Sequence, residues 1–239
     1  GQHGLSRRQS TRFADADADP MAALTTNVDG TRTVAEIADM HHTPLVYAST
    51  GSVYMPIVQE PPIREDFRVS GNSVYGCTKL MGEIIVRANA SPTIVLRYAH
   101  LYGAEKRGHG LIGGFLERIQ RGLEPVLYGG KQSNDFTYIR DVARANRLAL
   151  EASWDRWNQV YNIGTGEELT AEDAGRMVCE AWDYDGDIYR VPGREVDPER
   201  FVFDTSKAER MLGFKAEYTF ADGLREMVQQ GALARIRAA

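Results

Sequence analysis

The sequence has few cysteines and no long hydrophobic run. Its 239 residues include two cysteines, Cys77 and Cys179, too few for a disulfide framework and too far from other candidate ligands to hold a metal. No apolar stretch approaches the roughly 18 residues that a membrane-spanning helix needs, and no signal-peptide pattern begins the sequence. We therefore expect a cytoplasmic protein without a metal site or a membrane partner.

An excess of basic charge is also missing. The chain carries 28 lysines and arginines against 33 acidic residues, for a net charge of −5. No stripe of basic residues alternates with aromatic residues, so we expect no nucleic-acid partner. The length is sufficient for a substantial core in one or two domains.

A glycine-rich phosphate loop is the third absence. Dinucleotide-binding α/β domains begin with a strand, a glycine-rich turn and a helix whose N-terminus holds the pyrophosphate. Neither G-x-G-x-x-G nor G-x-x-G-x-x-G follows an early strand here. Residues 164–166, Gly-Thr-Gly, follow a strand-like segment, but they lie far downstream and lead into a helix N-cap pattern. We interpret them as a turn and not as a phosphate-binding loop.

The most informative segment begins with residues 45–49, a short apolar, β-branched and aromatic run typical of a buried parallel strand. The run ends in a polar turn that carries Ser49 and Thr50. Tyr75 and Lys79 follow at a spacing of i, i+4, which places both side chains on one face of a predicted helix. An ammonium beside a phenol favours the phenolate, so the pair can provide a tyrosine that acts as a base near neutral pH.

Two helices are predicted around this strand. Residues 73–88 continue the pattern that begins near Tyr75, and we interpret Glu83 within them as a solvated or ion-paired charge. Residues 20–40 form a second helical pattern. Residues 27–31, Asn-Val-Asp-Gly-Thr, interrupt this second pattern in a way that helix propensity does not favour.

The Tyr-x-x-x-Lys spacing alone is weak evidence, because most such pairs are ordinary neighbours on a helix surface. Together, residues 48–54 (Ala-Ser-Thr-Gly-Ser-Val-Tyr) and residues 75–79 (Tyr-Gly-Cys-Thr-Lys) resemble the active-site signature of extended short-chain dehydrogenase/reductases. Within that group the sequence is most similar to the NAD-dependent nucleotide-sugar epimerase/dehydratase family. The resemblance covers about residues 20–225.

The resemblance implies an α/β fold: a Rossmann-like doubly wound parallel sheet, truncated at its N-terminus, with a smaller C-terminal substrate-binding domain. We expect residues 1–104, joined by 135–165, to form a partial NAD-binding domain, and 105–134 with 166–239 to form the substrate domain. At about 30 residues for each βαβ unit, some 60 to 75 residues of the pattern are missing. The chain is either a piece of a longer protein or one that has lost half its sheet. An exposed strand edge is an aggregation hazard, which favours the first explanation.

The resemblance also assigns site residues. Tyr75 is expected to be the catalytic base, Lys79 to assist it and bond the nicotinamide ribose, and Thr50 to hold the sugar oxygen. Asn27 matches the asparagine that holds the active-site backbone near the cofactor. The expected cofactor-binding residues are Asn27, Ser49, Tyr75, Lys79 and Ala99, and the expected substrate-binding residues are Ser52, His100, Asn134, Arg194 and Asp197.

Some of the substrate positions depart from the family pattern. His100 replaces an asparagine that faces the sugar diphosphate, and Asn134 replaces an arginine that pairs with phosphate. An amide lacks the charged fork of a guanidinium, which weakens the case for a tightly held diphosphate. Residues 194–197 resemble the Arg-Glu-Gly-Asp segment with which 4-epimerases hold the nucleotide, although a charged surface loop is the alternative.

The resemblance implies an enzyme that uses NAD, with NADP as an alternative, to move a hydride on a sugar, which we expect to be nucleotide-linked. Dehydratases carry Asp-Glu where this chain has Gly51 and Ser52, so we expect a 4-epimerase or a simple oxidoreductase. Relatives pair the helices at 20–40 and 73–88 in a four-helix interface, which predicts a homodimer. The alternative is an inactive or fragmentary member that serves as a binding or scaffold protein. The missing phosphate loop supports that alternative, and the intact catalytic residues oppose it.

Overall fold

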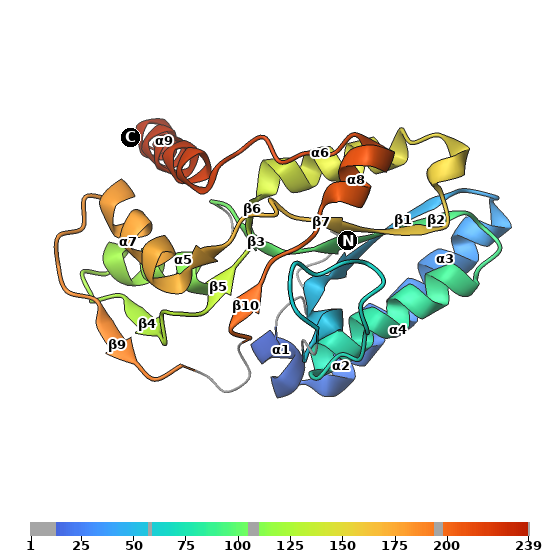
Figure 1. Ribbon diagram of the computed structural model, residues 1–239, viewed down its shortest axis with the longest axis horizontal. Helices are drawn as coiled ribbons and strands as arrows, with labels where there is room; N and C mark the ends of the chain where they lie inside the picture. Colours follow the sequence, from blue (N-terminus) through green and yellow to red (C-terminus); the bar gives the residue numbers. More distant parts are fainter. Residues whose placement is uncertain (1–12, 57–58, 105–109, 194–197, 239) are drawn as a thin grey trace. The chain divides into compact units, whose positions relative to one another are not determined.

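The computed structural model describes residues 13–56, 59–104, 110–193 and 198–238 (Figure 1). Contacts divide the chain into two compact units, each built from separate stretches of sequence. The first unit comprises Gly1–Glu60, Glu65–Tyr98 and Asn146–Asn162, and the second comprises Pro61–Arg64, Ala99–Ala145 and Ile163–Ala239. The domain boundaries expected from the sequence remain a prediction.

A three-stranded sheet organises the first unit. Its strand order is β1 (Leu45–Thr50), β2 (Thr93–Tyr98) and β7 (Gln159–Ile163). β1 and β2 are parallel, with Leu45 opposite Thr93 and Thr50 opposite Tyr98. Every residue of the central strand β2 is buried, as expected for a parallel strand covered on both faces. The α/β class with parallel sheets is therefore confirmed.

Helices α3 and α4 run along this sheet (Figure 1). The predicted helix at 20–40 consists of α2 (Pro20–Leu24), a π-helical turn η1 (Thr25–Asp29) and α3 (Gly30–Met40). The π turn includes part of the Asn-Val-Asp-Gly-Thr segment that interrupts the sequence pattern, and such turns often occur at functional sites. The predicted helix at 73–88 is α4 (Val74–Ala88), which Ser73 caps through a hydrogen bond of 3.0 Å from the Gly76 N–H. The remaining helices of this unit are α1 (Phe13–Ala18), η2 (Gly51–Tyr54) and η3 (Trp154–Arg156).

The described residues of the second unit form three short sheets. β3 (His100–Tyr102) pairs with β6 (Phe136–Tyr138), and β4 (Val126–Tyr128) pairs with β9 (Tyr189–Val191), both in parallel. β5 (Ser133–Asn134) lies between β10 (Arg200–Phe201) and β8 (Leu169–Thr170). The helices are α5 (Gly110–Gln120), α7 (Ala171–Ala181), α8 (Ser206–Leu212) and α9 (Phe220–Ala238), and α6 (Ile139–Leu150) begins in this unit and ends in the first. Tyr102, Phe115, Tyr138 and Leu224 are among the residues that form its core.

Within the described ranges, no helix is both long enough and apolar enough to span a membrane.

Candidate active site

Thr50 lies where β1 ends. Its Oγ1 accepts a hydrogen bond of 3.2 Å from the Ser52 N–H and lies 3.2 Å from the Ser52 hydroxyl oxygen. The bond from the Ser52 N–H caps the short helix η2 that follows the strand. The Thr50 hydroxyl is thereby fixed at the carboxyl end of a parallel strand, where open α/β sheets bind their ligands.

Tyr75 reaches Thr50 because the first turn of α4 packs closely on the turn after β1. A Cβ on Gly76 would lie 2.9 Å from the Ser52 carbonyl oxygen, so only glycine permits this approach. Burial raises the pKa of Tyr75 above its ordinary value, and a hydrogen bond with the Thr50 side chain opposes that rise. The structure therefore brings together two of the three predicted catalytic groups.

Lys79 lies one helical turn further along α4. Its Nζ is 4.6 Å from the ring centroid of Tyr47, a residue of β1. Burial lowers the pKa of Lys79 to about 8, and the nearby Glu83 carboxylate opposes that change. The sequence-based expectation that the ammonium lowers the pKa of Tyr75 is wrong for this arrangement, because burial raises that pKa.

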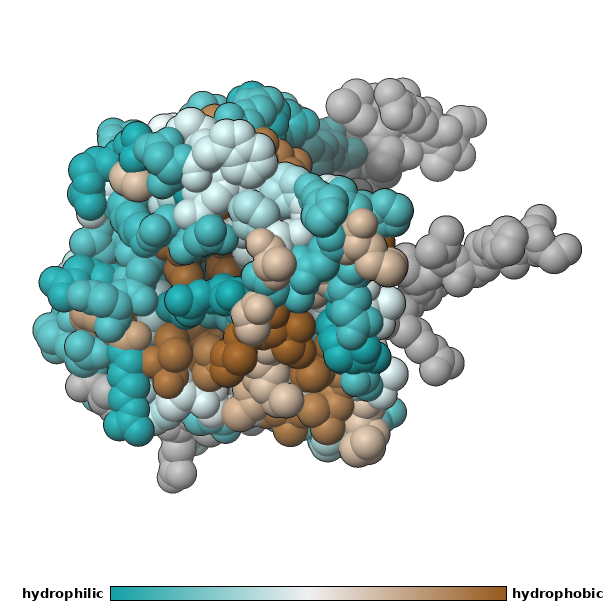
Figure 2. Space-filling model, turned by 90° about the vertical axis from the view of Figure 1, so that its right-hand side faces the viewer, coloured by the Kyte–Doolittle hydropathy of each residue, from teal (hydrophilic) through white to brown (hydrophobic). Residues whose placement is uncertain are grey.

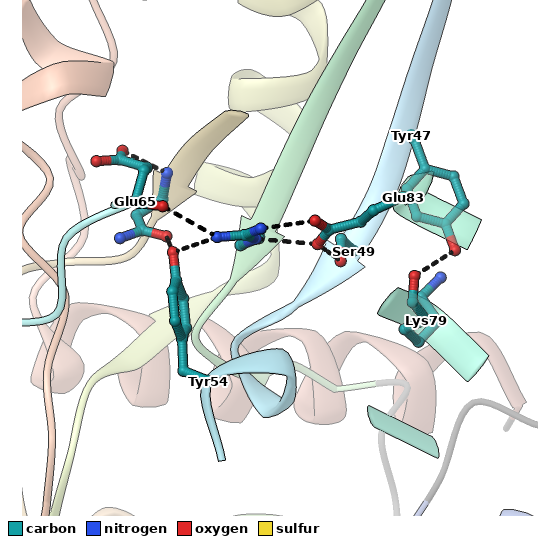
Figure 3. Close-up of polar contacts among 8 residues, drawn as sticks. Tyr47, Ser49, Tyr54, Glu65, Lys79 and Glu83 are labelled. Atoms are coloured by element: carbon teal, nitrogen blue, oxygen red, sulfur yellow. Dashed lines mark hydrogen bonds and ion pairs between the residues drawn. The ribbon is translucent and has the colours of Figure 1, made fainter. Parts of the chain in front are cut away.

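A buried polar network lies behind these residues (Figure 3). Arg97 Nη2 is 2.7 Å from Glu83 Oε2 and Arg97 Nε is 2.9 Å from Glu83 Oε1, a bidentate pair. The exposed fractions of Glu83 and Arg97 are 1% and 3%, so the pair lies in the core. The ion-paired alternative for Glu83 is thus confirmed, and Arg97 is a functional candidate that the sequence analysis missed.

This network joins several elements of the first unit. The Ser49 hydroxyl on β1 donates to Glu83 Oε1. On its other side, Arg97 Nη1 donates to the Tyr54 hydroxyl at 2.8 Å, and that hydroxyl donates to Asn162 Oδ1 at 2.8 Å. The Ser49 side chain is therefore engaged with Glu83, and its contact with a cofactor stays a prediction.

Asn27 contacts the catalytic helix from the π turn η1. Its Nδ2 donates to Thr78 Oγ1 at 3.0 Å, and Thr78 Oγ1 in turn donates to the Tyr75 carbonyl at 3.0 Å. Asn27 is buried, and its backbone carbonyl oxygen accepts a hydrogen bond of 2.6 Å from the Thr31 hydroxyl. It therefore stabilises the backbone of α4 between Tyr75 and Lys79.

The second unit holds the other predicted site residues. The Ala99 N–H donates to the Ile163 carbonyl at 3.0 Å. The exposed His100 ring meets Phe201 edge-on at 4.8 Å and borders a cavity of about 60 Å³ lined also by Phe136 and the start of α5. Asn134 is half-buried in β5. The predicted residues Arg194 and Asp197 lie outside the described residues.

The turn at residues 164–166 has its amide groups occupied by the chain itself. The Asp135 carboxylate accepts hydrogen bonds from the Thr165 N–H at 2.8 Å and from the Gly166 N–H at 3.0 Å. A carboxylate thus fills the position that a phosphate takes in a glycine-rich anion site. This geometry agrees with the interpretation of these residues as a turn.

Comparison with known proteins identifies relatives. The model of the NAD dependent epimerase/dehydratase family matches residues 11–164. A putative UDP-glucose 4-epimerase of Methanocaldococcus jannaschii is 31% identical over 212 residues, with 84% of this chain and 68% of the relative covered. A dTDP-glucose 4,6-dehydratase of Streptomyces niveus is 31% identical, with 85% of this chain and 62% of the relative covered. The chain therefore spans about two thirds of the length of these relatives.

Solved structures show the same similarity. The UDP-glucose 4-epimerase of Thermotoga maritima, solved with UDP-glucose, superposes with a TM-score of 0.87 at 28% identity, covering 95% of this chain and 76% of that one. A dTDP-glucose 4,6-dehydratase of Streptomyces venezuelae, solved with NAD and TYD, gives a TM-score of 0.86 at 26% identity, covering 95% and 72%.

Proposed function

The chain belongs to the NAD dependent epimerase/dehydratase family, and we propose that it epimerises carbon 4 of a nucleotide-linked sugar. The observation that carries the proposal is the hydrogen bond between the Thr50 and Tyr75 side chains, with Lys79 one turn further along α4. A hydroxyl, a phenol and an ammonium close to a strand end are the groups that proton transfer from a sugar alcohol requires.

The residues of the first unit fit the nicotinamide end of NAD. Lys79 would bond the nicotinamide ribose through its partly buried ammonium, and Asn27 and Ser49 would shape the backbone on which the cofactor lies. NAD, when bound, accepts the hydride from the sugar carbon and returns it. The family is NAD-dependent by its own description.

Proton transfer is the task of Tyr75 and Thr50. As the phenolate, Tyr75 would take the proton of the hydroxyl on carbon 4, and that carbon would become a ketone by giving its hydride to bound NAD. Thr50 holds the reacting oxygen, and its bond to Tyr75 favours the phenolate against the effect of burial. Tyr75 would return the proton to the oxygen when carbon 4 regains its hydrogen on the opposite face, which would give the epimer.

The residues beside Thr50 favour epimerisation over dehydration. A 4,6-dehydratase needs a further acid and base, and the positions after Thr50 are Gly51 and Ser52, neither of which carries a carboxylate. A scaffold role without catalysis is not favoured, because Thr50, Tyr75 and Lys79 are all present. A cytoplasmic location remains a prediction from the sequence.

Binding and turnover test the function together. We expect calorimetry with NAD to give a saturable signal, and UDP-glucose incubated with the chain and NAD to yield UDP-galactose by chromatography. If millimolar NAD gave no heat of binding and no UDP-galactose formed, the proposal would be contradicted. Conversion to a 4-keto-6-deoxy sugar, tested in parallel with dTDP-glucose, would instead favour dehydration.

We propose that His100, which borders the cavity at the start of α5, binds the substrate. His100→Ala should raise KM for the nucleotide sugar about tenfold and change kcat by less than about twofold, because the side chain would contact ground state and transition state alike. Steady-state kinetics measure this. His41→Ala, a change at an exposed histidine of the first unit, is the control and should leave both constants unchanged. An unchanged KM in His100→Ala would remove His100 from the binding site.

We propose that the partner of this chain is a second copy. Val34, Ile37 and Met40 on α3 are 51%, 47% and 70% exposed, and Met81 and Ile84 on α4 are 43% and 62% exposed. Figure 2 shows hydrophobic side chains gathered on the face that lies to the right in Figure 1, the side toward which α3 and α4 extend. Two adjacent helices with apolar residues can pair with themselves around a two-fold axis and form a four-helix interface.

Ile84→Glu is expected to shift the chain from dimer to monomer, since it places a charge in the centre of that interface. Sedimentation velocity at micromolar concentration measures the change. Leu123→Glu, at a residue of the second unit that is 46% exposed, should leave the dimer intact. A monomeric wild type would refute the proposal, as would a dimer that Ile84→Glu does not disturb.

A further inference from the structure

Tyr47 stands on the same face of β1 as Ser49, two residues before it, and both side chains turn toward α4 (Figure 3). Its ring packs in a core cluster with Ala35, Val86 and Val95. Its exposed fraction is 8%, so a packing role alone would explain a large side chain there. The contacts with α4 point to more than packing.

Tyr47 contacts Lys79 in two different ways. The ring face lies under the ammonium, with Nζ 4.6 Å from the ring centroid. The hydroxyl donates a hydrogen bond of 3.3 Å to the Lys79 carbonyl oxygen. One side chain therefore contacts both ends of the same lysine, and it does so from the strand that ends in Thr50.

Gly82 makes these contacts possible. A Cβ at position 82 would lie 2.0 Å from the Tyr47 hydroxyl oxygen and 2.6 Å from Cζ, and any side chain there would force the ring away from α4. Glycine is unfavourable inside a helix, and Gly82 lies well within α4. Glycine at position 82 thus lets the Tyr47 ring lie against α4.

We propose that Tyr47 is a positioning residue, which holds the Lys79 ammonium on its ring and the Lys79 backbone through its hydroxyl. An aromatic face attracts a cation most strongly where water is excluded. Burial raises the pKa of Tyr47, so it remains a neutral phenol that keeps its O–H donor. The inference rests on the proposed function in one respect only, namely that Lys79 is a catalytic residue.

The electrostatic surroundings of Lys79 define what should be measured. Burial lowers its pKa to about 8, while Glu83 favours the ammonium. The Tyr47 ring also favours the ammonium. Loss of the ring should therefore lower this pKa further, whereas loss of the hydroxyl alone should affect it little.

Lysine labelled with ¹³C and ¹⁵N provides a readout that does not depend on activity. The chain has five lysines, and Lys79→Arg assigns the signal of interest. In the wild type we expect the Lys79 ε-methylene protons to be shifted upfield by the ring. Tyr47→Phe should keep the shift. Tyr47→Leu should abolish it and lower the Lys79 pKa by about half a unit or more.

Two further variants separate positioning from packing. Tyr98→Leu removes a tyrosine of the neighbouring strand that is 9% exposed, and it should leave the Lys79 signal unchanged. Gly82→Ala should abolish the upfield shift while the ring itself is intact. The proposal would be overturned if the Lys79 ε-methylene protons of the wild type were not shifted upfield. It would also be overturned if the pKa of Lys79 in Tyr47→Leu were equal to or above the wild-type value. If the wild type shows no turnover, the proposed function is refuted. The Lys79 ε-methylene shift and the Lys79 pKa would still test the role of Tyr47.

Discussion

Tyr75→Phe is expected to lower kcat by about a hundredfold to ten-thousandfold, the range that a positioned general base contributes. The variant removes a single oxygen from a partly buried ring, so the fold should persist and circular dichroism should match the wild type. The oxygen removed is the one that bonds Thr50 and would receive the sugar proton. Tyr189→Phe is the matched control, because Tyr189 is 57% exposed and lies on β9, and it should turn over at the wild-type rate. Wild-type turnover in Tyr75→Phe would dismiss the mechanism.

The pH dependence of the wild type follows from the same tyrosine. Burial raises the pKa of Tyr75, so near neutral pH the phenol predominates and only a minor fraction is the phenolate that acts as a base. The rate should therefore rise with pH as the phenolate becomes populated. Lys79, whose pKa is lowered to about 8, loses its charge at a lower pH than Tyr75 loses its proton, and this loss should end the rise. A rate that falls from pH 6 to pH 8 would contradict this assignment.

Arg97→Met is expected to lower the free energy of unfolding by about 3 to 5 kcal/mol, because it leaves the Glu83 carboxylate buried without its partner. Arg97 holds that carboxylate through two bonds of 2.7 and 2.9 Å, and Glu83 is only 1% exposed. Urea unfolding followed by circular dichroism measures the loss. The double variant Arg97→Met/Glu83→Leu should recover much of it, since neither charge then remains in the core.

An exposed ion pair provides the control for this cycle. Arg32 and Glu36 pair on the surface of α3, with side chains 55% and 56% exposed, and Arg32→Met should change the free energy of unfolding by less than about 1 kcal/mol. If Arg97→Met and Arg32→Met lowered the free energy of unfolding by similar amounts, the buried Arg97–Glu83 pair would contribute no more to stability than the exposed pair. Failure of the double variant to recover stability would show that other bonds of the network, such as that to Tyr54, dominate.

Much of the site could be predicted from local sequence signals. The apolar run before Ser49 marks β1, and the i, i+4 spacing of Tyr75 and Lys79 marks the face of α4. The interruption at residues 27–31 overlaps the π turn η1, where β-branched threonine and valine residues weaken the regular helix. These features depend on residues close together in the chain, which is why pattern and spacing reveal them.

The rest depends on contacts between distant residues. Tyr54 and Asn162 are 108 positions apart, and nothing in either segment indicates their hydrogen bond. Arg97 lies within a run of apolar strand residues, so its pairing with Glu83 requires the packing of α4 on the sheet. The i, i+4 spacing indicates that Lys79 lies near Tyr75 but not how deeply Tyr75 is buried, so it predicts the wrong direction for the pKa of Tyr75, which burial dominates.

The most direct test of the Thr50–Tyr75–Lys79 site follows a label through one turnover. UDP-glucose carrying deuterium on carbon 4 is incubated with the chain and NAD, and the UDP-galactose formed is analysed by mass spectrometry and proton NMR. Since the hydride that leaves carbon 4 is the one that returns, the product should retain its deuterium, and Tyr75→Phe should form almost no product. Loss of the deuterium to solvent, or equal conversion by Tyr75→Phe, would contradict hydride transfer at this site.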